Sequence, residues 1–314
     1  MGSKPTITIV MPVRNEASQI RDNVQRVDRI LTEAGIAHGF VLVNDGSKDS
    51  TWAELSSLAA SLEGVIAANL SRNYGKEAAL CAGIGLATGD AVVTIDADLQ
   101  HPPEIIVEMV RLWLEDGYDV IEGVKRDRGK QSPFHKAGAA VFYKVFSALT
   151  GIDLDQATDF KLLDRKVVDA LALMGETSVF FRGMTSWVGY RHCEIPFDVG
   201  DRLAGRSSWS LRSLFAYAVH STASFTSLPL HLISYIGVAF CALALALGIE
   251  TLWTKVSGAA IGGFTTVILL LLIIGGVVMI DLGVIGLYLA KIYEETKARP
   301  RFIISEIRDA RTDG

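Results

Sequence analysis

The sequence predicts a mainly parallel α/β domain that is followed by a two-helix transmembrane hairpin. Three observations carry this prediction. Apolar, strand-like stretches alternate with amphipathic, helix-like stretches through residues 6–125, polar side chains follow where those strands end, and two long uncharged stretches lie near the C-terminus. Strands and helices that alternate at this spacing are typical of βαβ units, in which helices cover both faces of a parallel sheet.

The elements of the α/β domain can be assigned in order from their apolar patterns. Strands are expected at Thr6–Val13, Phe40–Val43, Val65–Leu70, Ala91–Ile95 and Tyr118–Glu122. Helices are expected at Ser18–Ala34, Thr51–Leu62, Glu77–Ala87 and Pro103–Glu115. The first helix shows the pattern most clearly, since its apolar residues recur at helical spacing: Ile20, Val24, Val27 and Leu31.

The chain beyond residue 125 is less regular up to residue 205. Phe134–Leu149 has the pattern of an amphipathic helix. Residues 209–227 combine aromatic side chains with Ser, Thr and one Arg, which is typical of a helix at the lipid headgroup level. We therefore expect an α/β domain over residues 1–208 and an interfacial helix over 209–227.

Two uncharged stretches predict membrane spans. No Asp, Glu, Lys or Arg lies between Arg212 and Glu250, or between Lys255 and Asp281. A span needs about 20 apolar residues, and core helices of soluble proteins normally keep a polar face. We expect spans at about 229–252 and 259–285, within residues 228–290, and a cytoplasmic tail over 291–314.

The charges that flank the spans predict the topology. Arginines precede the first span and Lys291, Lys297, Arg299 and Arg301 follow the second, whereas the connection offers only Lys255. By the positive-inside rule, both termini and the α/β domain face the cytoplasm. The sequence predicts a multi-pass protein of the cell (inner) membrane.

The composition argues against several classes of protein. A net charge of −5 argues against a nucleic-acid partner, since such partners are bound by many Lys and Arg side chains. Three scattered cysteines without a metal-binding spacing argue against a zinc site and a disulfide framework. Gly83, Gly85 and Gly89 miss the dinucleotide fingerprint and lie within or after an expected helix, and no P-loop occurs.

Two carboxylates end the expected strand at Ala91–Ile95. Asp96 and Asp98 are one residue apart, and Gln100 supplies a third oxygen donor before the Pro-Pro pair. Hard oxygen ligands suit Mg²⁺ or Mn²⁺, which usually takes further ligands from substrate phosphates. The pattern favours a metal site for a diphosphate at the carboxyl end of the sheet, where such sheets bind ligands.

An ordered set of motifs resembles a known family. "IVMPVRNE", "VNDGSKDST", "LSRNYGKEAAL", "ATGDAVVTIDADLQHPPE" and "DRLAGRSS", followed by two spans, resemble family 2 glycosyltransferases of GT-A fold. Within that family the chain is similar to polyisoprenyl-phosphate glycosyltransferases, the group of dolichol-phosphate mannose synthase and bacterial undecaprenyl-phosphate (bactoprenol) glucosyltransferases. The resemblance covers nearly the whole chain.

The resemblance implies roles for individual residues. The nucleotide sugar would contact Pro12, Arg14, Glu16, Asp45, Lys76 and Asp96, with Asp45 reaching the base. The divalent metal would be held by Asp96, Asp98 and Gln100, and Asp159 in "ATDFKLLDR" would lie near the anomeric carbon of the sugar as the catalytic acid residue. The phosphate of the lipid acceptor would meet Arg126, Arg128, Arg202 and Arg206, since guanidinium groups grip phosphate bidentately.

The implied reaction is the inverting, metal-dependent transfer of one sugar to a polyisoprenyl phosphate at the cytoplasmic membrane face. The bacterial resemblance favours glucose from UDP-glucose and an undecaprenyl acceptor, while mannose, N-acetylhexosamine and aminoarabinose remain open. A processive polysaccharide synthase and a non-catalytic membrane scaffold are the alternatives. The first usually carries Gln-x-x-Arg-Trp and more spans, and the second predicts lost acids, whereas Asp45, Asp96, Asp98 and Asp159 are all present. We expect a homo-oligomer, with a tetramer favoured.

Overall fold

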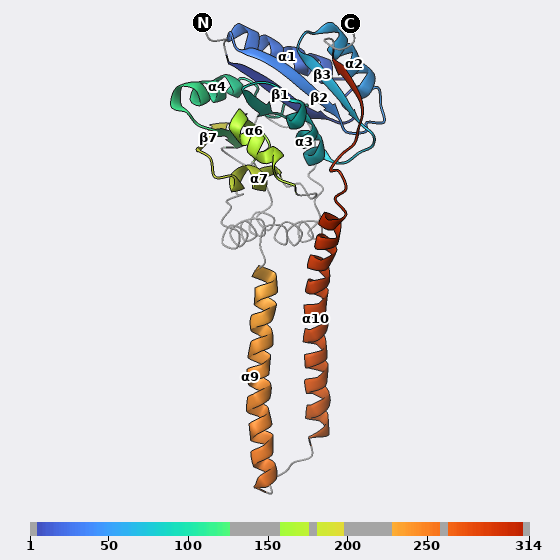
Figure 1. Ribbon diagram of the computed structural model, residues 1–314, viewed down its shortest axis with the longest axis vertical. Coiled ribbons are helices and arrows are strands. Elements are labelled where there is room, and N and C mark those ends of the chain that lie inside the picture. Colours follow the sequence, from blue (N-terminus) through green and yellow to red (C-terminus); the bar gives the residue numbers. More distant parts are fainter. Residues whose placement is uncertain (1–4, 126–157, 176–180, 198–227, 258–262, 310–314) are drawn as a thin grey trace. The chain divides into compact units, whose positions relative to one another are not determined.

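The computed structural model describes residues 5–125, 158–175, 181–197, 228–257 and 263–309. The chain divides into two compact units, of which one comprises Met1–Ser208 and Pro300–Gly314 and the other Trp209–Arg299. The first unit is an α/β domain, and the second contains two long helices (Figure 1). The helix expected at Phe134–Leu149 and the interfacial helix expected at 209–227 lie outside the described residues.

The first five strands of the α/β domain follow the predicted order, and three further strands come after them in the sequence. They are β1 (Thr6–Val13), β2 (Ala37–Asn44), β3 (Val65–Leu70), β4 (Ala91–Thr94), β5 (Val120–Lys125), β6 (Lys161–Asp164), β7 (His192–Phe197) and β8 (Ile304–Asp309). The helices are α1 (Ile20–Glu33), α2 (Thr51–Ser61), α3 (Lys76–Leu86), α4 (Ile105–Asp116), α6 (Arg165–Ala172) and α7 (Phe181–Trp187). The nine elements expected from the sequence up to β5 are all present, with boundaries that differ by a few residues.

All eight strands form one sheet in the order β7-β5-β6-β4-β1-β2-β3-β8. The central strands β4, β1, β2 and β3 pair in parallel, and β6 and β8 pair antiparallel with the neighbours that they contact. The sheet is therefore mixed, since β6 and β8 run against the other six strands. Neither of these two strands was expected from the sequence. The parallel centre brings the carboxyl ends of β1, β2 and β4 to one edge.

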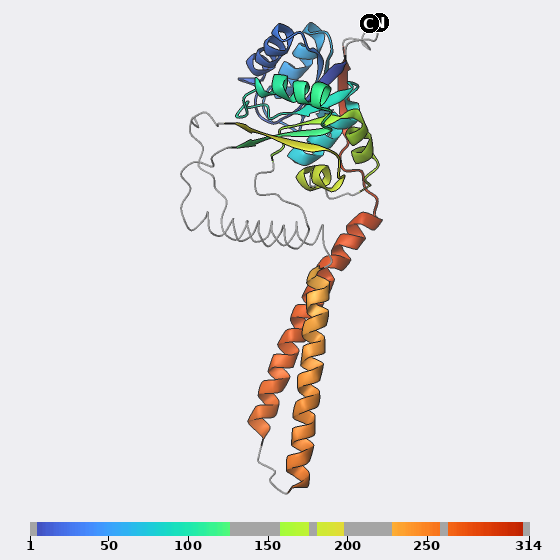
Figure 2. The same ribbon diagram turned by 90° about the vertical axis from the view of Figure 1, so that its left-hand side faces the viewer.

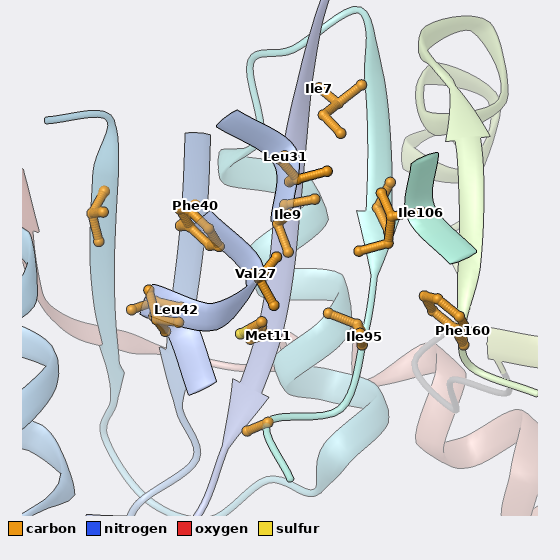
Figure 3. Packing of buried hydrophobic residues seen from close by; sticks show 14 of the residues in the cluster. Ile7, Ile9, Met11, Val27, Leu31, Phe40, Leu42, Ile95, Ile106 and Phe160 are labelled. Carbon is orange, nitrogen blue, oxygen red and sulfur yellow. The ribbon is translucent and has the colours of Figure 1, made fainter. Parts of the chain in front are cut away.

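Helices cover both faces of the sheet. One buried cluster contains the apolar side of α1, the same four residues at helical spacing, together with side chains of α2 and α4 (Figure 3). The other cluster lies on the opposite face and contains side chains of α3, α6 and α7. Burial of one such aliphatic side chain contributes about 1.5–3 kcal/mol, so these two layers hold the sheet edge in place.

Gly83 explains how closely α3 packs on the sheet. A Cβ atom at Gly83 would lie 2.4 Å from Cγ1 of Val10 and 3.2 Å from Cγ2 of Val43, whereas a Cβ atom at Gly85 would meet nothing within 4 Å. Gly83 thus allows the close packing of α3 on the sheet, whereas Gly85 has no such role.

The C-terminal segment returns to the α/β domain. Strand β8 pairs antiparallel with β3, and the Ser71 N–H donates to the Ile303 carbonyl over 2.9 Å. Phe302 and Ile304 pack against the second buried cluster. The segment predicted as a tail therefore contributes an edge strand, a role that six residues of mixed polarity did not reveal.

The second unit holds α9 (Leu228–Val256) and α10 (Phe264–Thr296), which contact each other and run in opposite directions (Figure 2). Large apolar side chains along both helices are exposed, including Leu245 at 69% and Leu271 at 64%. By length and composition, one described stretch, Ile273–Thr296, qualifies to cross a membrane, and Tyr235–Glu250 is a shorter apolar helix. Helical structure is thus present in both expected spans, while the two-span hairpin itself stays a prediction.

Candidate active site

A pocket of about 280 Å³ lies where β1, β2 and β4 end. Its lining comes from the loops after these strands and from the start of α3: Pro12, Val13, Arg14, Glu16, Asp45, Lys76, Asp96, Ala97 and Asp98. Six of these residues were expected to contact a nucleotide sugar, and the parallel sheet brings them together from segments far apart in the sequence. Gln100 lies beside the pocket without lining it.

Two loops of this pocket contain a non-glycine residue with left-handed backbone. Asn15 has a φ of 55° between Arg14 and Glu16, and Leu99 has a φ of 48° between Asp98 and Gln100. Such a conformation costs of order 1 kcal/mol or more and persists where surrounding contacts enforce it. The contacts are present here, since the Asn15 side chain accepts from the Lys48 N–H over 2.9 Å and Leu99 packs against the first cluster.

Asp45 fixes the loop that leads to Lys76. Its buried carboxylate accepts hydrogen bonds from the backbone N–H groups of Tyr74 at 2.7 Å and Gly75 at 3.0 Å. A carboxylate has further lone pairs, so these bonds leave acceptor capacity for a nucleotide base. The base contact stays a prediction, and the observed role of Asp45 is to place the first residue of α3.

Asp96 and Asp98 both line the pocket but have different surroundings. Asp96 accepts from Nζ of Lys76 over 2.6 Å, and its loop is fastened to α1 by the Asn23 side chain, which donates to the Ala97 carbonyl over 2.7 Å. Asp98 is exposed and accepts from Nε2 of Gln100 over 2.8 Å. Within the described residues, no group of three or more His, Cys, Asp or Glu is arranged to hold a metal ion. Asp96, Asp98 and the Gln100 amide oxygen are hard ligands of the kind that suits a divalent cation, and the metal site that they would form stays a prediction.

Asp159 does not line the pocket and meets two cations behind Lys76. Its buried carboxylate accepts from Nζ of Lys76 over 2.6 Å and from Nε and Nη2 of Arg182 over 2.8 and 3.1 Å. Burial alone would raise the pKa of Asp159, but the hydrogen bonds and charges of Arg182 and Lys76 outweigh it and hold the pKa well below its ordinary value. Asp159 is therefore a carboxylate at every physiological pH and a weak proton acceptor.

Lys76 joins the two acidic groups. Its ammonium contacts Asp96 and Asp159 at the same distance of 2.6 Å. Burial would lower the pKa of Lys76, but attraction to Asp159 and Asp96 outweighs it and raises the pKa. A fixed positive charge thus lies between Asp96, which follows β4, and Asp159, which precedes β6.

The pKa of Glu77, the next residue of α3, is raised, whereas that of Asp159 is lowered. Burial and the nearby charge of Asp159 raise its pKa to about 7, against the attraction of Arg182 and Lys76 and a hydrogen bond from the Phe181 backbone. Glu77 therefore titrates in the physiological range beside a carboxylate that does not.

Arg182 and Glu77 are two site residues that were not predicted from the sequence. Arg182 lies in residues 150–205, for which no helix or strand was predicted, and Glu77 was predicted only as the first residue of a helix. The four arginines expected at the acceptor phosphate, Arg126, Arg128, Arg202 and Arg206, lie outside the described residues.

Comparison with known proteins identifies the domain that contains this pocket. Residues 8–171 match the model of the family "Glycosyl transferase family 2". Over 303 residues the chain is 40% identical to an uncharacterized glycosyltransferase of Synechocystis sp., covering 96% of this chain and 95% of that one. It is 34% identical to the prophage bactoprenol glucosyl transferase homolog of Escherichia coli (96% and 99% covered) and to the bactoprenol glucosyl transferase of Shigella phage SfX (95% and 98% covered).

Proposed function

Since this chain belongs to glycosyl transferase family 2 and is a glycosyltransferase, we propose that it transfers one sugar from a nucleotide sugar to a polyisoprenyl phosphate. The names of the bactoprenol glucosyl transferases, to which it is similar over nearly its full length, support this acceptor and favour glucose from UDP-glucose. Undecaprenyl phosphate is the acceptor that we propose, at the cytoplasmic face of the membrane.

One observation carries the proposal. The ammonium of Lys76 bridges Asp96, in the predicted metal motif, and Asp159, the predicted catalytic carboxylate, at 2.6 Å each. The same pocket is lined by the expected nucleotide-binding residues. A donor whose diphosphate lies at Asp96 and Asp98 would thus present its sugar toward Asp159.

The reaction that suits this pocket is a single in-line displacement with inversion. An oxygen of the lipid phosphate attacks the anomeric carbon while the bond to the nucleoside diphosphate breaks. The second pKa of a phosphate monoester is near 6, so the attacking oxygen is already largely anionic at neutral pH. Asp159, whose pKa is lowered, would position the sugar through its fixed carboxylate and would take up no proton.

Asp96, Asp98 and Gln100 would hold Mg²⁺ or Mn²⁺, which when bound would neutralise charge on the leaving diphosphate. Lys76 supplies a further positive charge on the same side of the pocket, and Arg14 is exposed at its lining. Arg126, Arg128, Arg202 and Arg206 are our candidates for the acceptor phosphate, because Arg forks bind phosphate bidentately.

Helices α9 and α10 would anchor the enzyme in the membrane as a hairpin with both termini in the cytoplasm. Their exposed apolar side chains and the apolar stretch Ile273–Thr296 support this anchor. Tethering would confine the search for a lipid acceptor to the membrane surface. We retain a homo-oligomer, with a tetramer favoured, as part of the proposal.

The test is a donor panel with membranes that contain the full chain. Labelled UDP-glucose, GDP-mannose, UDP-N-acetylhexosamine and UDP-aminoarabinose are each supplied with undecaprenyl phosphate and Mn²⁺. We expect a butanol-soluble product with one sugar from UDP-glucose, and no such product from membranes that lack the chain. A polymer would instead indicate a processive synthase, and transfer to water alone would contradict the lipid acceptor.

A further inference from the structure

A buried ion pair lies behind Asp159 and takes no part in the proposed chemistry. Nζ of Lys161 is 2.9 Å from Oε2 of Glu122, and the two residues are 1% and 3% exposed. A buried pair is weak support for stability, because the loss of hydration offsets much of its attraction. An apolar pair of similar size would fill the same space, so packing alone does not explain why the pair is charged. The explanation lies in the hydrogen bonds that the two side chains make with other residues.

Glu122 holds the backbone on one side of Asp159. Its second oxygen accepts from the backbone N–H of Thr158, and the Thr158 hydroxyl donates to the Gly123 carbonyl over 2.6 Å. His192 of β7 also approaches Glu122, with Nε2 at 3.4 Å from Oε2. Burial would raise the pKa of Glu122, but His192 and Lys161 outweigh it and lower the pKa, so Glu122 acts as a charged acceptor. Strand β5 thereby fixes the residue that precedes Asp159.

Lys161 holds the helix that carries the partner of Asp159. Its Nζ donates to Oγ1 of Thr185 over 2.8 Å, and that hydroxyl donates to the carbonyl of Arg182 over 3.0 Å. Thr185 lies one turn after Arg182 on α7, and the Arg182 guanidinium grips the Asp159 carboxylate. A chain of contacts therefore runs from β5 through Lys161 to α7 and back to the acid.

We propose that Glu122 and Lys161 are positioning residues for catalysis, which hold the backbone of Asp159 and the helix of Arg182 in one fixed geometry; this rests on the proposed role of Asp159. Thr94 completes the frame from β4, where its hydroxyl donates to the Asp159 carbonyl over 2.5 Å. An apolar pair could not make the hydrogen bonds by which Glu122 and Lys161 hold Thr158 and Thr185. The acid is thus held through its main chain by two strands and through its side chain by Lys76 and Arg182.

The first test removes the pair without leaving one buried charge alone. Glu122→Gln/Lys161→Met keeps the side-chain volumes and an amide oxygen for the Thr158 N–H. We expect a folded protein in which kcat falls about fivefold while KM for UDP-glucose changes less than about twofold, because the nucleotide contacts are untouched. The control is Arg21→Met/Glu54→Gln, which removes a half-exposed 3.0 Å ion pair between α1 and α2 and should leave both constants unchanged.

The second test asks whether the pair acts through Asp159. In an Asp159→Asn background, Glu122→Gln/Lys161→Met should lower the remaining kcat less than about twofold, since residues that act as one unit are non-additive. An equal loss in both backgrounds would overturn the proposal, and so would an unchanged kcat in the folded double variant.

A milder pair of variants keeps the test decisive if the double variant fails to fold or Asp159→Asn is inactive. Thr185→Val keeps the shape of the side chain and removes the hydroxyl that links Lys161 to Arg182, whereas Thr185→Ser keeps that hydroxyl. We expect kcat to fall about threefold in Thr185→Val and to be retained in Thr185→Ser. Equal rates in the two variants would count against the link.

The proposed function can fail separately. If the wild-type chain transfers no sugar to undecaprenyl phosphate, the acceptor assignment is wrong. The same variants are then compared by their slow hydrolysis of UDP-glucose, in which the order of rates still reports on the pair.

Discussion

Lys76 lies between two groups of residues that are built in different ways: the donor wall, which lines the pocket, and the wall of Asp159, which lies behind Lys76. The wall that carries Asp45, Asp96 and Asp98 consists of loops that directly follow parallel strands, and the sheet alone brings them together. The wall that carries Asp159 is held by charged and polar contacts among β5, β6 and α7. The first wall is the one that would bind the donor, and the second would align the reacting sugar. Changes in the first should therefore affect metal and donor binding, and changes in the second should affect turnover.

The largest effect is expected from Asp98→Asn on the donor wall. Asp98→Asn would remove one of the two carboxylates that we propose hold the cation, so we expect transfer to fall at least about 1000-fold, or ~4 kcal/mol of barrier. Transfer is measured against Mn²⁺ concentration, and Mn²⁺ binding is measured separately by electron paramagnetic resonance. Glu104→Gln is the control, since that acid contacts Arg26 outside the pocket. Normal Mn²⁺ affinity in Asp98→Asn would contradict the metal assignment.

A smaller loss is expected from Asp159→Asn on the opposite wall. If Asp159 positions the sugar, kcat should stay within about tenfold of the wild-type value, ~1.4 kcal/mol of barrier. A complete loss would show that Asp159 is a general base.

The pH dependence tests whether the pKa of Asp159 is lowered, since the carboxylate is ionised in either role. Because the folded pKa of Asp159 is below its ordinary value of 3.8, its stabilising charge is present above that value and is lost only as the pH falls through the lowered pKa. The kcat of the wild type should therefore show no step between about pH 5 and 8 that disappears in Asp159→Asn.

The donor wall could be predicted from the sequence, whereas on the other wall only Asp159 could be named, through the family resemblance, and its partners could not. Asp45, Asp96 and the loop at Arg14 follow apolar strands, so a parallel sheet determines where they meet. Strands β7 and β8 leave most of their residues at least partly exposed and lack the continuous buried apolar run of β4, and β6 begins and ends with a charged residue. None of the three therefore shows a clear pattern without knowledge of the partner strand. Arg182 is brought to Asp159 by contacts between side chains far apart in the sequence, and local periodicity carries no signal for such contacts.

Glu77, which follows Lys76 in the first turn of α3, is expected to make the stability of the domain moderately dependent on pH. Its folded pKa of about 7 is above its ordinary value of 4.5, so the stability that it contributes is full below 4.5 and is lost as the pH rises through 7. Glu77→Gln removes this dependence. We expect the Tm of the detergent-solubilised wild type to fall relative to that of the variant from pH 5 to pH 8. Glu63→Gln, an exposed glutamate before β3, is the matched control. Parallel Tm curves for the wild type and Glu77→Gln would show that Glu77 does not titrate here.

The smallest effect on activity is expected where α3 packs on the sheet, because α3 places Lys76 between the walls. A methyl group at Gly83 would lie 2.4 Å from the Val10 side chain, so Gly83→Ala should destabilise the domain by about 1–3 kcal/mol. Gly85→Ala meets open space on the same helix and should stabilise it by up to about 1 kcal/mol, since alanine is the better helix former. Thermal unfolding of both variants measures the two shifts, which should have opposite signs. If both variants were stabilised, α3 would not lie as close to β1 as described, and the position of Lys76 between Asp96 and Asp159 would have to be revised with it.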